Sequence, residues 1–231
     1  MAEIPYAHDE PTGDLLCRKS LADDQVAVAA DALARWRRSS ARVSFVAIDG
    51  HGASGKTTLA KSLRAITKAS VVHTDDFFVP GSPGQSGRGI GRYYDVGRLR
   101  AEALEPLKAG HEAVFRSFDW ELGALSAVCT RVEPSDLVIV EGVYSAAPEL
   151  SDLVDKAIYV DTAERERLDR LQGRVAPEDW DQEWLAAEKE YFARARPIGS
   201  FDLVIRGSVT GPPVPRDARV PCEGRRAGNS S

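Results

Sequence analysis

The fold is decided by residues 50–57, GHGASGKT, which directly follow the apolar run VSFVAID at residues 43–49. A buried strand that opens into a glycine-rich turn is typical of a phosphate-binding loop, in which backbone N–H groups point at phosphate oxygens. In such a loop Lys56 adds a positive charge, and the Thr57 hydroxyl can ligate Mg²⁺. The alternative is a glycine-rich turn that binds nothing, but such a turn has no need of the Lys-Thr pair at its end.

The residues after the loop support the same interpretation. Residues 58–68 are predicted to form a helix, and the positive N-terminus of that helix would face the bound phosphate. The residues predicted to bind ATP are Gly50, Gly52, Ala53, Ser54, Gly55, Lys56, Thr57 and Thr58.

Composition restricts the class of protein. With 231 residues, of which 43% are hydrophobic, the chain supports one α/β domain with an accessory lid, or at most two small domains. The net charge is −5 with scattered Arg and Lys, so we expect neither a nucleic-acid nor a membrane partner. Three distant cysteines, no N-terminal apolar segment and no run long enough to span a membrane predict a cytoplasmic protein.

Apolar runs alternate with helical patterns along the chain. Continuous runs at residues 137–140, 157–160 and 203–205 are typical of strands buried on both faces. We therefore predict an α/β, three-layer P-loop NTPase fold with a mostly parallel sheet, helices on both faces and a small Arg-containing lid. The predicted organisation is an N-terminal extension with one helix (1–41), the P-loop domain (42–207, lid about 165–182) and a disordered tail (208–231).

Two acidic residues come at the ends of predicted strands, where ligands bind in parallel sheets. Asp75 follows the strand at residues 70–73 and is the candidate general base for an acceptor hydroxyl. Asp76 competes for that role, and either carboxylate could simply cap the following turn. Glu141 ends a hydrophobic strand and resembles a Walker B acid, which would hold Mg²⁺; a helix cap or an ion pair is its alternative.

An ordered set of motifs resembles the uridine kinase family of P-loop kinases, which is close to nicotinamide riboside and pantothenate kinases. The motifs are GHGASGKT, VVHTDDFF, RYYDV, FDW, VIVEGVY, an Arg-rich segment and DLVIRG, and they cover residues 43–207. The resemblance implies transfer of a phosphoryl group from ATP, with Mg²⁺, to the 5′-hydroxyl of a nucleoside such as uridine or cytidine. Nicotinamide riboside, another sugar metabolite and an antibiotic hydroxyl are the alternative acceptors. Relatives are often oligomeric, so a homo-oligomer stays open.

The resemblance also implies roles for individual residues. Asp75 and Lys56 would be catalytic, Asp95 would hold ribose hydroxyls, and arginines of the lid would contact phosphates and substrate. The residues implied in substrate binding are Asp75, Phe78, Tyr94, Asp95, Phe118, Asp119, Trp120, Arg167, Arg170 and Arg174. As alternatives, Asp95 would cap a helix beginning near Gly97, and the arginines would form a solvated helix face.

A second hypothesis from another class is a nucleotide-binding regulatory module that hydrolyses ATP slowly to switch a partner. Such a module needs a second sensing element coupled to an interaction surface. The first 40 residues and the last 24 are too few to form a substantial added domain, so the kinase hypothesis is favoured.

Overall fold

The computed structural model of the chain describes residues 23–38, 43–79, 93–172 and 179–207. The predicted tail at 208–231 and the first 22 residues of the predicted N-terminal extension lie outside the described residues. None of the helices in the described ranges combines the length and apolar character needed to cross a bilayer.

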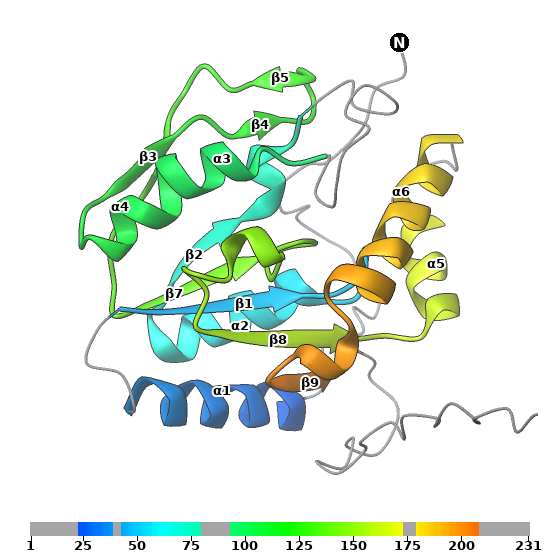
Figure 1. Ribbon diagram of the computed structural model, residues 1–231, viewed down its shortest axis with the longest axis horizontal. Helices are drawn as coiled ribbons and strands as arrows, with labels where there is room; N and C mark the ends of the chain where they lie inside the picture. The colour runs from blue at the N-terminus through cyan, green and yellow to red at the C-terminus, as the bar shows by residue number, and fades with distance from the viewer. Residues whose placement is uncertain (1–22, 39–42, 80–92, 173–178, 208–231) are drawn as a thin grey trace, which may run out of the picture.

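A five-stranded sheet forms the centre of the molecule, and all its strands are parallel (Figure 1). Its strand order is β2-β7-β1-β8-β9. The strands are β1 (Ser44–Asp49), β2 (Ser70–His73), β7 (Leu137–Glu141), β8 (Lys156–Asp161) and β9 (Leu203–Arg206). Because neighbouring strands run in the same direction, the residues that follow β1, β2 and β7 meet at one edge of the sheet.

One face of the sheet is covered by α1 (Asp23–Arg38) and α2 (Lys56–Thr67). Of the two, α1 runs along the bottom of Figure 1. Alternate residues of each strand point to this side. Val46 and Ile48 of β1 pack there with Leu59 and Leu63 of α2 in one buried cluster. The first described helix, α1, is therefore part of a layer outside the sheet.

The opposite face is covered by one continuous helical segment. It consists of α3 (Val96–Arg98), a π-helical stretch (Leu99–Leu104) and α4 (Glu105–Lys108). Phe45 of β1 and Val138 of β7 point to this face and pack against the segment, whereas the residues next to them in each strand point to the face covered by α1 and α2. The three predicted layers and the predicted parallel sheet are thus confirmed.

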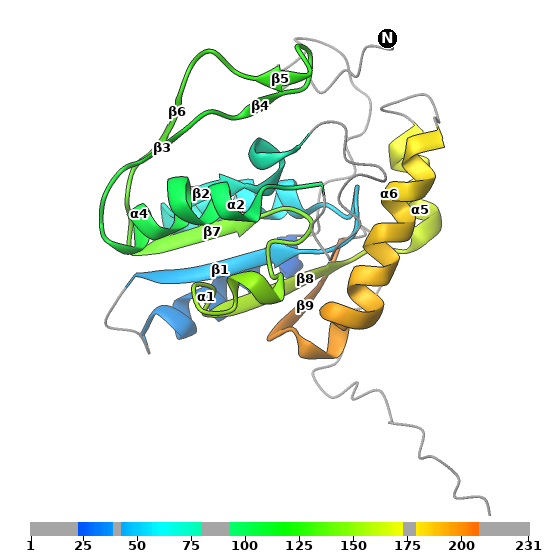
Figure 2. The same cartoon turned by 45° about the horizontal axis from the view of Figure 1, so that its top comes forward.

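Two short antiparallel pairs extend from the helical layer, at the top of Figure 2. They join β3 (Ala113–Phe115) to β6 (Thr130–Val132), and β4 (Phe118–Asp119) to β5 (Ala124–Leu125). The second pair places aromatic residues beside the pocket described below.

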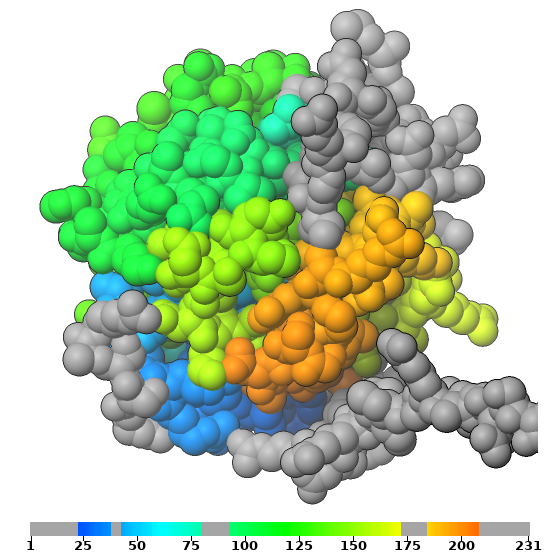
Figure 3. Space-filling view, in the orientation of Figure 1, coloured from blue at the N-terminus to red at the C-terminus, as the bar shows by residue number. Residues whose placement is uncertain are grey.

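Two further helices, α5 (Glu164–Gln172) and α6 (Asp179–Glu190), stand at the end of the sheet toward which β1 and β8 point (Figure 1). A π-helical turn, Tyr191–Ala195, continues α6. In Figure 3 the chain from α6 onward lies against the segment that follows β7. The rings of Tyr191 and Tyr144 make this contact, with centroids 4.7 Å apart.

Candidate active site

A pocket opens where the phosphate loop, the ends of β2 and β7, and α6 meet. It is lined by Gly52, Ala53, Ser54, Gly55, Lys56, Thr57, Thr58, Asp75, Tyr94, Trp120, Glu141, Gly142, Val143, Leu171, Trp184, Leu185 and Glu188. Residues from three predicted strand ends therefore share one cavity.

The phosphate loop has the backbone that its sequence requires. Gly50 has a φ of 144°, and an added Cβ would lie 2.7 Å from the Val160 carbonyl oxygen. Gly55 precedes α2 in the left-handed region, and no side chain caps that helix. The first N–H groups of α2 therefore have no partner within the helix and can bind an anion. Lys56 Nζ donates to the His51 carbonyl oxygen at 2.9 Å.

Thr57 and Glu141 form the part of the site that fits a divalent cation. Thr57 Oγ1 donates to Glu141 Oε1 at 2.9 Å, and His73 Nδ1 lies 2.7 Å from Glu141 Oε2. Burial alone would raise the pKa of Glu141, but the hydrogen bond and charge of His73, together with the charge of Lys56 and the hydrogen bond of Thr57, lower it. A hydroxyl and a carboxylate oxygen are ligands that Mg²⁺ prefers.

Two protein ligands match the number that is usual for Mg²⁺ in such sites. Within the described ranges, no three His, Cys, Asp or Glu side chains gather to hold a metal by themselves. Mg²⁺ in phosphoryl-transfer sites is typically held by one or two protein ligands together with substrate phosphates and water. The donor set around Thr57 therefore fits Mg²⁺ that arrives with a nucleotide.

Asp75 lies in the 3₁₀ turn Thr74–Phe77 and faces the pocket. Tyr94 Oη donates to Asp75 Oδ1 at 2.8 Å. Burial, and next the negative charge of Glu141, raise the pKa of Asp75 above its ordinary value. Asp76 instead lines a separate pocket between α2 and β6. The two adjacent carboxylates are therefore directed to different cavities.

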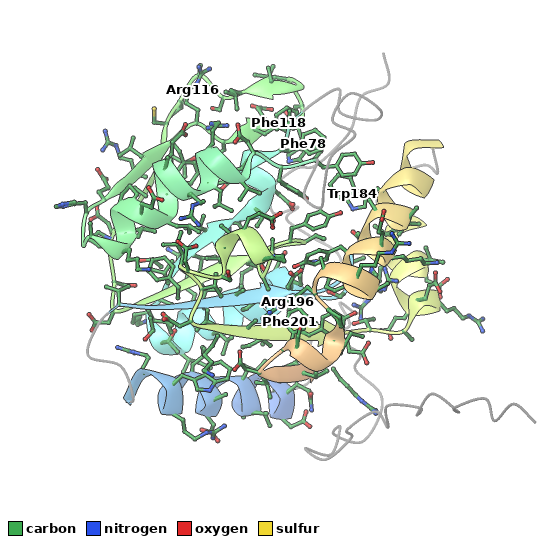
Figure 4. All side chains as sticks on the ribbon, in the orientation of Figure 1. Phe78, Arg116, Phe118, Trp184, Arg196 and Phe201 are labelled. Atoms are coloured by element: carbon green, nitrogen blue, oxygen red, sulfur yellow. The ribbon has the colours of Figure 1, made fainter. Side chains whose placement is uncertain are left out.

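Aromatic side chains border the pocket as well. Phe78 contacts Trp120 and Phe118, with ring centroids 4.5 and 4.8 Å apart. Figure 4 shows Trp184 extending from α6 toward Phe78, and the two rings are nearly parallel with centroids 6.1 Å apart. This edge of the pocket therefore presents ring faces from three segments that are distant in the sequence.

Two acidic residues implied in substrate binding serve as caps. Asp95 Oδ1 accepts a hydrogen bond from the Arg98 backbone N–H at 2.9 Å, which is the helix-cap alternative. Asp119 Oδ1 accepts from the N–H groups of Glu121 and Leu122, both at 3.0 Å. Neither carboxylate is part of the pocket lining in the described chain.

The arginines of the predicted lid contact the back of the phosphate loop. Arg167 Nη1 donates to the Gly52 carbonyl oxygen at 3.3 Å, and Arg170 Nη1 donates to the Ala53 carbonyl oxygen at 3.0 Å. Arg167 is only 3% exposed, so the alternative of a solvated helix face is wrong for this residue. Arg174 lies outside the described residues.

Glu188 is a pocket residue that the sequence analysis missed. It is fully buried and bonds to the phosphate loop at Gly52 and His51. Burial alone would raise the pKa of Glu188, but the hydrogen bond from His51 and the charge of Lys56 lower it. One signal was present: Glu188 shares a helical stripe with Trp184 and Tyr191, and a carboxylate in an apolar stripe is unusual.

Comparison with known proteins agrees with this geometry. No protein-family model matches the chain. Uridine kinases from three strains of Clostridium perfringens are 31% identical over 130 residues, which are 52% of this chain and 62% of those proteins. The match therefore spans less than two thirds of the length of these relatives.

Solved structures with the same fold extend the comparison. A structure described as a possible uridine kinase from Bacillus stearothermophilus aligns with a TM-score of 0.62 at 23% identity, over 79% of this chain and 98% of that one. A candidate fructose transport system kinase from Silicibacter sp. TM1040 aligns with a TM-score of 0.62 at 21% identity, over 78% and 98%. Sequence and fold together confirm the resemblance predicted from the motifs: this chain is similar to the uridine kinase-like P-loop kinases.

Proposed function

We propose that the chain is an ATP-dependent kinase that transfers the γ-phosphoryl group to a hydroxyl of a small molecule. The domain at residues 42–207 carries the activity, with ATP on the phosphate loop and Asp75 as the general base. The loop, the base and the magnesium ligands share one pocket, which supports this assignment.

The observation that carries the proposal is the contrast among the three carboxylates in the pocket. Glu141 and Glu188 each accept hydrogen bonds on both oxygens, and both have a lowered pKa. Asp75 accepts one described side-chain hydrogen bond, from Tyr94, and has a raised pKa. A base must have a free oxygen and an affinity for a proton, and of the three Asp75 best meets both conditions.

Each group of residues has a separate role in the proposed reaction. N–H groups at the start of α2 and the Lys56 ammonium bind the phosphates and stabilise the charge that develops on the transferring group. Thr57 and Glu141 would hold Mg²⁺, which when bound would neutralise charge on the phosphate oxygens. Asp75 orients the acceptor hydroxyl and accepts its proton as the new P–O bond forms.

For the acceptor, we propose a nucleoside, with uridine or cytidine as the first choice. Trp120 and Trp184 line the pocket, and aromatic side chains are suited to packing against a planar base. The similarity to proteins named uridine kinase supports the same choice. Nicotinamide riboside and sugars are the alternatives within this mechanism, since a structural neighbour is described as a fructose transport system kinase.

A panel assay tests the proposal. The purified chain is incubated with ATP, Mg²⁺ and uridine, cytidine, nicotinamide riboside or fructose, and ADP release and product mass are measured. Asp75→Asn is expected to bind ATP normally but to lose about 10²- to 10⁴-fold in kcat. Asp76→Asn is the matched control and is expected to retain most activity, because Asp76 lines the other pocket.

Two outcomes would contradict the proposal. The first is the absence of any phosphorylated product across the panel while ATP is hydrolysed at the same rate without an acceptor. The second is turnover in Asp75→Asn equal to that of Asp76→Asn, since no general base would then be acting at position 75.

A further inference from the structure

Glu188 is a buried carboxylate beside the phosphate loop that the proposed phosphoryl transfer does not use. We propose that Glu188 is a positioning residue that holds the first half of the phosphate loop in its ATP-binding shape. This inference rests on the proposed function and deepens it, because it assigns a determinant of nucleotide affinity to α6.

The carboxylate has a complete set of donors. The Gly52 backbone N–H lies 3.1 Å from Oε1 and 3.0 Å from Oε2. Trp184 Nε1 donates to Oε1 at 2.6 Å, and His51 Nδ1 lies 3.0 Å from Oε2. Glu188 is 0% exposed, so these partners replace water as its source of hydrogen bonds.

The same part of the loop is held from its other side by α5. Arg167 bonds to the Gly52 carbonyl oxygen, while Arg170 bonds to the carbonyl oxygen of Ala53. The N–H and the C=O of Gly52 therefore bond to side chains from two different helices. Orientations of these peptide groups are fixed by tertiary contacts before a ligand arrives.

The position of Glu188 favours loop positioning over competition with phosphate. Its N–H partner is Gly52, whereas the N–H groups that lack helix partners belong to the start of α2, after Gly55. The contact is also close: a Cβ added to Gly52 would lie 3.2 Å from Glu188 Oε1. Glycine at position 52 thus allows the carboxylate to approach the loop backbone.

A loop fixed in advance binds its ligand more tightly, because less conformational entropy is lost on binding. Without the carboxylate, the Gly52 N–H and the Trp184 N–H lose a charged acceptor, and the loop can take other orientations. Since Glu188 acts on the loop and not on one phosphate, its loss should weaken binding of diphosphate and triphosphate nucleotides alike.

The experiment measures nucleotide affinity directly. Isothermal titration calorimetry with Mg²⁺ and either ADP or a non-hydrolysable ATP analogue is run on the wild type, Glu188→Ala and Glu188→Gln. Glu188→Ala is expected to weaken both nucleotides about 10- to 100-fold, the range for loss of hydrogen bonds to a charged group. Glu188→Gln should regain part of the affinity, because its amide oxygen can still accept from Gly52.

The matched control is Glu190→Gln, on the same helix. Its side chain is 57% exposed and pairs with Arg194, so its nucleotide affinity should equal that of the wild type. With an acceptor from the panel, Glu188→Gln should raise the KM for ATP more than it lowers kcat. A merely structural role would lower the melting temperature without this selective change.

The results of these titrations distinguish failure of the Glu188 inference from failure of the kinase proposal on which it rests. Equal affinities in the wild type, Glu188→Ala and Glu188→Gln would overturn the inference and leave the kinase proposal standing. Tighter binding of the ATP analogue but not of ADP would also overturn it, since Glu188 would then compete with the terminal phosphate. A wild type that binds neither nucleotide would overturn both proposals.

Discussion

Asp49, the last residue of β1, gives a prediction whose magnitude follows from the structure. Its Oδ1 accepts from the N–H groups of Gly50 (2.7 Å) and Tyr144 (3.1 Å), and its Oδ2 accepts from the Ala146 N–H (3.0 Å) and Tyr191 Oη (2.7 Å). Burial nevertheless dominates and raises the pKa of Asp49 from 3.8 to about 6. Replacement by asparagine removes this titration.

The sign of the effect follows from proton binding. Between pH 3.8 and about 6 the folded protein keeps a proton on Asp49 that the unfolded chain has released. The free energy of unfolding therefore falls as pH rises through this window. Because one pKa unit corresponds to about 1.4 kcal/mol, Asp49 should contribute a loss of about 3 kcal/mol above pH 6 relative to acid pH.

Urea unfolding of the wild type and Asp49→Asn, from about pH 4 to about pH 7.5, measures this loss. Asp49→Asn keeps a neutral side chain at every pH, so its stability should not show this loss. The stability of the wild type relative to Asp49→Asn should therefore fall by about 3 kcal/mol as pH rises. A difference that stays constant with pH would refute the reasoning.

Asp152, an exposed carboxylate whose pKa is lowered and not raised, supplies the control. Arg100 lowers the pKa of Asp152 to about 2, so above about pH 5 this carboxylate is ionised in the folded and the unfolded states alike. The stability difference between the wild type and Asp152→Asn should therefore be flat above about pH 5.

Two further predictions concern the catalytic groups. Tyr94→Phe removes the donor to Asp75 Oδ1, so the pKa of Asp75 should rise and the acidic limb of kcat/KM should move to higher pH. If the acidic limb of the pH–rate profile were the same in Tyr94→Phe as in the wild type, a group other than Asp75 would be responsible for it. Thr57→Val removes the hydroxyl beside Glu141 and should raise the Mg²⁺ concentration for half-maximal activity about tenfold or more. Thr67→Val, at the far end of the same helix, is the control, and equal Mg²⁺ requirements in the two variants would contradict the assignment.

Most of the fold could be predicted because its signals are local. Strands buried on both faces appear as unbroken apolar runs, and β1, β7 and β8 follow those runs to within a residue or two. The glycine-rich loop marks both the end of β1 and the start of α2. The helix begins at Lys56 rather than at residue 58, because Gly55 in the left-handed region already ends the loop.

The missed parts of the site depend on contacts between distant segments. Glu188 reaches Gly52 across 136 positions of the chain, and the motifs quoted for the resemblance do not include it. The role of Asp95 could not be decided from the sequence, because the same short motif is compatible with a helix cap and with a ribose ligand. In the structure, the Asp95 carboxylate accepts a hydrogen bond from the Arg98 N–H.

The lid arginines can assist phosphate binding without touching a phosphate. Arg167 and Arg170 bond to carbonyl oxygens of the loop, and a neutral carbonyl does not cancel the charge of a guanidinium group. Glu166 offsets part of the charge of Arg170 through a 2.6 Å ion pair, but Arg167 has no described carboxylate within hydrogen-bond distance. Because Arg167 is buried behind the loop, its field is weakly screened by solvent and adds to that of Lys56 at the phosphate site. On the proposed function, Arg167, which bonds to the Gly52 carbonyl oxygen, would therefore also make the loop more attractive to a triphosphate.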